Sequence, residues 1–155
     1  MNEDRLRTLV GLFLVISHFV IALAIALSYG SGGILFDQMV TSFGLILPLF
    51  AGYATIILKY FIDHRHDAPN STFVTFPFAA LTLLVPVLYV LFVLIILALK
   101  SFNVVFGSFE QFKTMLGVSE TIFAVYVGML INALFIPKAT AKVPKPPSTR
   151  PATEA

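Results

Sequence analysis

Few side chains that could carry chemistry fall within the long apolar stretches of this chain, and His18 stands out among them. His18 lies near the centre of the first stretch and is the one residue there that can change charge near neutral pH. An ionisable residue inside a membrane is a functional candidate by default. His18 is therefore a candidate proton sensor, gate or relay. The alternative is a structural hydrogen bond to Ser17 or to a neighbouring helix.

Glu120 is the second candidate, and the sequence predicts it in the first turn of the fourth helix. Together with Ser119 it would cap that helix, or it would lie at the outer mouth of a pathway. This prediction leaves His18 without a second ionisable residue clearly at its own depth, so no relay is complete.

Residues 36–61 and 109–134 resemble one another at an offset of 73 residues, which indicates a duplicated unit. Both contain the motif Phe-Asp/Glu-Gln-x-x-Thr-x-x-Gly and a later tyrosine. The motif either starts a helix or places Gln38 and Gln111 in a polar vestibule. Tyr53 and Tyr126 either hold the bundle together by interhelical hydrogen bonds or line a pathway, because a buried phenol needs a partner.

Composition indicates that this unit belongs in a membrane. The chain has 155 residues, of which 58% are hydrophobic and 12% charged, whereas soluble domains carry about 25% charged residues. Four apolar runs approach or exceed the roughly 20 residues that cross a bilayer. We predict an all-α integral membrane protein with four transmembrane helices, arranged as two tandem helical hairpins in a parallel 2+2 repeat. The predicted spans are 6–29, 38–61, 73–100 and 118–136.

These spans make up a transmembrane domain over residues 1–137, and residues 138–155 are predicted to be a disordered cytoplasmic tail. Eight of the ten Lys and Arg residues lie before the first apolar run (9–29), between the second (39–58) and the third (73–99), or after the fourth (121–136). By the positive-inside rule, both termini are cytoplasmic. We therefore expect a protein of the plasma membrane or of a bacterial inner membrane.

Small residues mark the expected helix-packing faces, since they let backbones approach closely. They are Ala22, Ala26, Gly44, Gly52, Ala124 and Gly128.

Other classes of function have little support. The absence of cysteine excludes disulfides, thiol redox catalysis and cysteine metal sites. The run from Asp63 to Asp67 is better explained as a solvated loop than as a metal site. No nucleophile–base pair converges, and no motif places the chain in a known four-span family. We expect no enzyme activity, no cofactor, no metal and no nucleic-acid partner.

Three functions remain open. The first is a membrane-embedded subunit of a homo-oligomer, forming an ion-conducting or membrane-permeabilising pore between copies. The second is a non-conducting anchor or sensor module for a soluble cytoplasmic protein. The third is a small proton-linked transporter with His18 as its main candidate residue. The lipid bilayer is the expected environment of all three.

Overall fold

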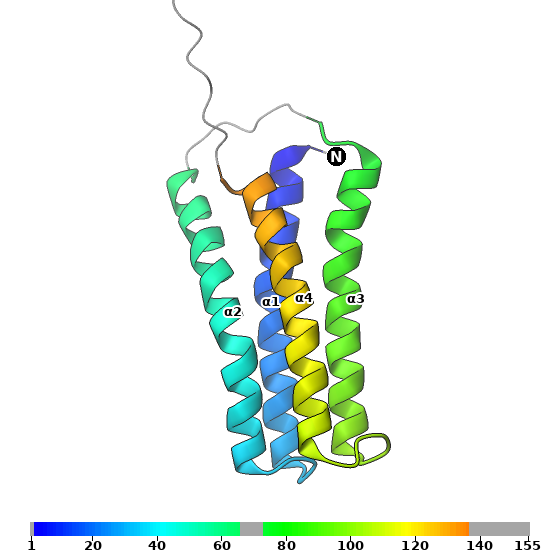
Figure 1. Ribbon diagram of the computed structural model, residues 1–155. Coiled ribbons are helices and arrows are strands. Elements are labelled where there is room, and N and C mark those ends of the chain that lie inside the picture. The colour runs from blue at the N-terminus through cyan, green and yellow to red at the C-terminus, as the bar shows by residue number, and fades with distance from the viewer. Residues whose placement is uncertain (1, 66–72, 137–155) are drawn as a thin grey trace, which may run out of the picture.

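The computed structural model describes residues 2–65 and 73–136, which form a four-helix bundle (Figure 1). The helices are α1 (Glu3–Gly30), α2 (Phe36–Asp63), α3 (Phe76–Ser101) and α4 (Phe109–Leu134). They alternate in direction, so the N-terminal end of α1 and the C-terminal end of α4 lie at the same end of the bundle (Figure 1). The predicted tail at 138–155 lies outside the described residues.

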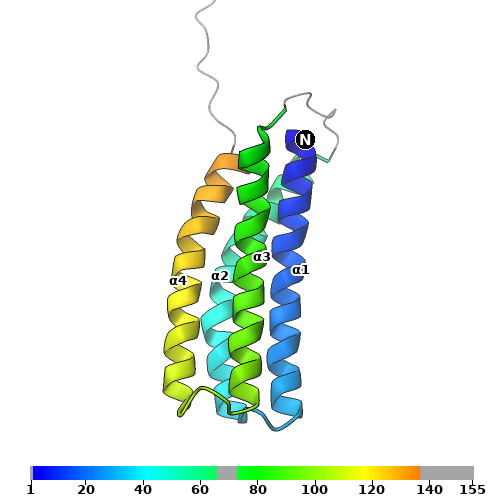
Figure 2. The same ribbon diagram turned by 90° about the vertical axis from the view of Figure 1, so that its right-hand side faces the viewer.

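Each helix packs against two others. α1 contacts α2 and α3, and α4 contacts the same two helices. α1 and α4 therefore lie across the bundle from one another, as the two views show (Figures 1 and 2). The order around the bundle is α1, α2, α4, α3.

All four helices are long and apolar enough to cross a membrane. The shortest have 26 residues, which corresponds to about 39 Å at 1.5 Å per residue. The hydrocarbon core of a bilayer is about 30 Å thick. The prediction of an all-helical chain with four spanning-capable helices is confirmed.

The core follows one stripe on each helix. Along α1, buried apolar residues recur every three or four positions or at a multiple of that spacing, which is the period of a helix with one face inward. They are Leu6, Val10, Leu14, Ile21 and Ile25. Along α3 the stripe is Ala79, Thr82, Pro86, Tyr89, Val93, Ile96 and Lys100. Outside these stripes the helices present large apolar side chains to their surroundings, as expected for lipid contact.

The fourth helix differs most from its prediction. The first three helices begin and end within three residues of their predicted bounds. In contrast, α4 begins at Phe109 and not near residue 118. Ser108 caps it, accepting a hydrogen bond from the Gln111 backbone N–H at 3.4 Å. The predicted cap at Ser119 is wrong.

Amphipathicity explains the additional turns of α4. Phe112 and Leu116 are buried, while Glu110 and Lys113 form an ion pair of 2.6 Å on the exposed side. Charged residues in this segment lower its mean hydropathy, so the span predicted from the sequence begins only at residue 118. Its apolar residues nevertheless keep the helical spacing of four.

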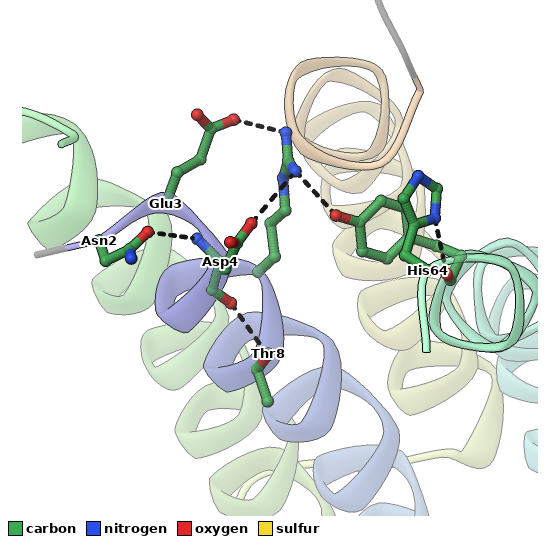
Figure 3. A network of polar contacts seen from close by, with 7 residues as sticks. Asn2, Glu3, Asp4, Thr8 and His64 are labelled. Atoms are coloured by element: carbon green, nitrogen blue, oxygen red, sulfur yellow. Dashed lines mark hydrogen bonds and ion pairs between the residues drawn. The ribbon is translucent and has the colours of Figure 1, made fainter. Parts of the chain in front are cut away.

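A polar network ties α1 to α2 at the end of the bundle that holds the N-terminus (Figure 3). Arg7 forms an ion pair with Glu3 at 2.5 Å and donates a hydrogen bond to the Tyr60 hydroxyl at 2.7 Å. The Tyr60 ring stacks on His64 with ring centres 4.2 Å apart. Asn2 caps α1 by accepting a bond from the Asp4 backbone N–H. His66 and Asp67 of the loop considered above lie outside the described residues.

The opposite end is closed by a tight turn between α1 and α2. Gly32 has φ 77°, a left-handed conformation that favours glycine. Gly33 lies against α3, because a Cβ built on it would be 2.8 Å from the Ser101 Cβ and 2.9 Å from its Cα. The Ser101 and Ser28 hydroxyls are hydrogen-bonded there at 2.9 Å.

Gly33→Ala should therefore destabilise the bundle, because the added methyl group meets the backbone of α3. Overpacking of this kind costs about 1–3 kcal/mol. Gly44→Ala is the matched control, since nothing lies within 4 Å of the Cβ position there. Thermal unfolding in detergent should show a lower midpoint for Gly33→Ala only. Equal midpoints for the two variants would contradict this packing.

Candidate functional site

One polar side chain from each helix converges in the interior of the bundle. These residues are His18 of α1, Tyr53 of α2, Tyr89 of α3 and Glu120 of α4, which we call the central polar cluster. Their exposed fractions are only 2%, 3%, 8% and 6%. Because the surrounding core is apolar, each polar atom of the cluster needs a hydrogen-bond partner inside the bundle.

His18 is held by the backbone of its own helix. Its Nδ1 lies 3.0 Å from the Leu14 carbonyl oxygen. A carbonyl can only accept, so Nδ1 carries a proton and Nε2 is the basic nitrogen of the neutral ring. This Nε2 is buried and has no hydrogen-bond partner. The expected contact with Ser17 is weak, at 3.5 Å, because the Ser17 hydroxyl donates to Leu14 instead.

Aromatic rings surround the imidazole. Phe50 and Phe123 stack on it with ring centres 5.5 and 5.9 Å away, and Tyr89 does so at 6.0 Å. Tyr53 approaches edge-on at 5.1 Å. Tyr89 and Phe123 also stack on each other at 3.7 Å, which joins α3 to α4. His18 is thereby fixed by rings from the other three helices.

Glu120 lies in the middle of α4, and its predicted place in the first turn is wrong. The cause is the earlier start of the helix at Phe109. Glu120 continues the buried stripe of Phe112 and Leu116, so its carboxyl group enters the bundle. The Tyr89 hydroxyl donates to its Oε1, while its Oε2 is buried without a partner. His18 thus does have a second ionisable residue in the same interior cluster.

Tyr89 was not predicted from the sequence, although a signal for it was present. Thr82, Pro86, Tyr89 and Val93 are spaced by three or four residues and form one helical face. In a helix that is apolar nearly all round, the few polar residues on one face indicate the inward direction. Tyr89 would have been found on that basis.

The two repeated tyrosines both hold helices together. The Tyr53 hydroxyl is 3.5 Å from the Leu14 carbonyl of α1. The Tyr126 hydroxyl donates to the Thr82 carbonyl of α3 at 3.1 Å. That carbonyl is four residues before Pro86, whose ring nitrogen cannot donate to it. Tyr126 therefore supplies the donor that the proline removes.

Gln38 and Gln111 do not enter the central polar cluster. Each accepts a hydrogen bond at the start of its own helix, from Leu35 N–H at 3.2 Å and from Gly107 N–H at 3.0 Å. Both are consistent with the structural alternative, in which the repeated motif starts a helix.

The predicted packing residues are only partly used within the bundle. Ala22 and Ala124 are half-buried, while Ala26, Gly44, Gly52 and Gly128 are exposed. At the last three, a Cβ would meet nothing within 4 Å. The glycine that α1 places against α2 is Gly11, whose Cβ position is 3.0 Å from Ile57. Sequence analysis did not single out Gly11.

The fold and the cluster define a four-helix, membrane-spanning-capable protein with an ionisable pair in its interior. No family model, curated protein or solved structure matches the chain. Among the described residues, no three His, Asp or Glu side chains gather as a metal site would require. Chemically, the cluster can hold a proton or attract a cation, because an unpaired carboxylate there would be costly.

Tyr126→Phe should cost about 1–3 kcal/mol, because it leaves the Thr82 carbonyl buried without its donor. In a Pro86→Ala background the cost should be smaller, since a backbone N–H returns at position 86. Unfolding of the wild type, the two single variants and the double variant in detergent gives the coupling energy directly. An equal cost in both backgrounds would disprove the compensation.

Proposed function

We propose that this protein is a small proton-linked membrane transporter whose proton-binding centre is the central polar cluster. The observation that carries the proposal is that Glu120 and His18 each keep one buried side-chain atom without a hydrogen-bond partner. A base and an acid held in one apolar interior can exchange a proton where few other groups can. Such residues in membrane helices mark proton relays and substrate pathways.

The proposed role is binding and transport rather than catalysis. The Ser17 hydroxyl, 3.5 Å from His18 Nδ1, donates to the Leu14 carbonyl at 3.1 Å. It is therefore engaged by the backbone and is not set up as a nucleophile.

The interior also argues against a pore within one copy. His18, Phe50, Tyr89 and Phe123 stack across the centre of the bundle, where a water-filled pathway would have to run. A pore built from this chain would lie between copies, and the buried Glu120 would then have no role in it. A carrier that changes conformation around the cluster gives that residue a function.

The proposal includes an orientation and a duplication. Both termini would be cytoplasmic, in a plasma membrane or a bacterial inner membrane.

The two hairpins would be related by a sideways shift, since α1 neighbours α3 and α2 neighbours α4. The sequence match between residues 36–61 and 109–134 supports the duplication.

Reporter fusions at the two ends of the chain should both report the cytoplasm. The helices are even in number, and most of the described Lys and Arg residues lie at the end of the bundle that holds the start of α1 and the end of α4. Fusion of the same reporter at Gly32, in the turn between α1 and α2, is the control and should report the opposite side. Ends on different sides would contradict the orientation.

The proton-binding centre can be tested by infrared difference spectroscopy of the whole protein in lipid. Acidification should produce a carboxylic acid C=O band at the frequency of an apolar environment. Glu120→Gln should remove this band, because the amide cannot take up the proton. Glu110→Gln is the matched control on the same helix, since Glu110 is exposed and ion-paired. A band that survives Glu120→Gln would refute the proposed centre.

A further inference from the structure

A groove on the outer surface of the bundle, between α2 and α4, leads toward the central polar cluster. Its volume is about 260 Å³. Its exposed rim includes Gly52, Ile56 and Gly128, and its floor includes the buried Tyr53, Val127 and Ile131. The two rim glycines leave open space where other residues would place side chains. The groove therefore faces the surface that lipid would cover.

Tyr53 belongs both to the floor of this groove and to the cluster. Its ring meets Phe50 at 5.7 Å and His18 at 5.1 Å, both edge-on. His18 in turn stacks on Tyr89 with ring centres 6.0 Å apart, and the Tyr89 hydroxyl donates to Glu120. A molecule in the groove would thus contact Tyr53, the first of a series of contacting rings that ends at the carboxyl group of Glu120.

These features favour a positively charged ligand. Aromatic rings attract cations through the negative potential of their faces, and the unpartnered Oε2 of Glu120 adds a negative charge whenever the carboxyl group is ionised. From the other helices, Tyr89 donates a hydrogen bond to Glu120, and His18 and Tyr53 are the further members of the same cluster. None of them is a fixed cation that would neutralise it. An inorganic ion is an unsuitable ligand, because the groove offers it few oxygen atoms.

We propose that the transported ligand is a lipophilic organic cation, which enters from the membrane through the groove between α2 and α4 and competes with a proton for Glu120. This inference rests on the proposed proton-binding role of the cluster. One negative charge cannot neutralise a cation and a proton at once. Binding of either would therefore release the other, which is the coupling that an exchanger requires.

Tetraphenylphosphonium is a suitable probe, because it is apolar and permanently positive. Equilibrium dialysis with the full chain in nanodiscs of zwitterionic lipid should show saturable binding above that of empty nanodiscs. Binding should weaken as the pH falls, because protons occupy Glu120. Glu120→Gln should weaken it by more than about tenfold at neutral pH, because it removes a negative charge whose attraction is only weakly screened in an apolar interior.

Three controls make the result specific. Tetraphenylborate has the same shape and the opposite charge, and it should not show saturable binding. Gly52→Leu and Gly128→Leu should block the groove and abolish binding of tetraphenylphosphonium. Gly44→Leu should leave it unchanged, because Gly44 also has open space around it but does not line the groove.

The inference is overturned if wild type and Glu120→Gln bind the probe equally, if binding does not respond to pH, or if the two groove variants bind as wild type does. The infrared band of Glu120 separates this failure from that of the proposed function. If the band is present and depends on Glu120 while the probe does not bind, the proton-binding centre stands and the cation ligand is wrong. If the band is absent, the proposed function itself fails.

Discussion

The carboxyl group of Glu120 is buried in the middle of an apolar bundle, and the side chains around it must stabilise it there. A carboxyl group in such surroundings needs hydrogen bonds or a counter-charge. The bundle supplies one bond, from the Tyr89 hydroxyl, and leaves the other oxygen open. Phe123 stacks on Tyr89 and keeps that ring in place. Tyr89 and Phe123 also stack on His18, so the buried acid is linked through these rings to side chains on the other helices.

Backbone carbonyls form a second level of this arrangement. In lipid, polar backbone groups must be satisfied within the protein. The Leu14 carbonyl accepts from the Ser17 hydroxyl and from His18 Nδ1, which leaves the histidine with its Nε2 as the basic atom. Pro86 removes a donor from the Thr82 carbonyl, and Tyr126 replaces it from α4. These bonds settle which atoms of the interior are occupied and which remain available to a ligand.

Hydropathy was sufficient to predict four helices, but not the position of Glu120 along the fourth. Long apolar runs indicate spans because charged residues interrupt them. The first turns of α4 contain Glu110 and Lys113, which face outward, so averaging along the chain concealed a helix that periodicity would have revealed. Once α4 begins at Phe109, the spacing of Phe112, Leu116 and Glu120 places the acid in the core. Tyr89 was overlooked for a related reason, since the exposed apolar residues of α3 outnumber those that mark its inner face.

The groove and the meeting of four helices at one level could not be read from the sequence. Which helix neighbours which depends on tertiary packing, and the order α1, α2, α4, α3 is what brings Tyr53 and the glycines of two helices around one hollow. Gly52 and Gly128 were expected to be helix contacts, yet both are exposed and no atom of a neighbouring helix lies against them.

In the proposed duplication, residues that pack the bundle match across the two halves, whereas the ionisable pair does not. Phe50 and Phe123, which match across the two halves, both stack on the imidazole. His18 and Glu120 have no such match, because Leu91 and Leu47 occupy the corresponding positions. If an ancestral hairpin was doubled, its packing would be inherited by both copies. The ionisable pair would then be what distinguishes the halves, with the base in the first hairpin and the acid in the second. Neither hairpin alone could then form the proton-binding centre, so the two must be docked for it to exist.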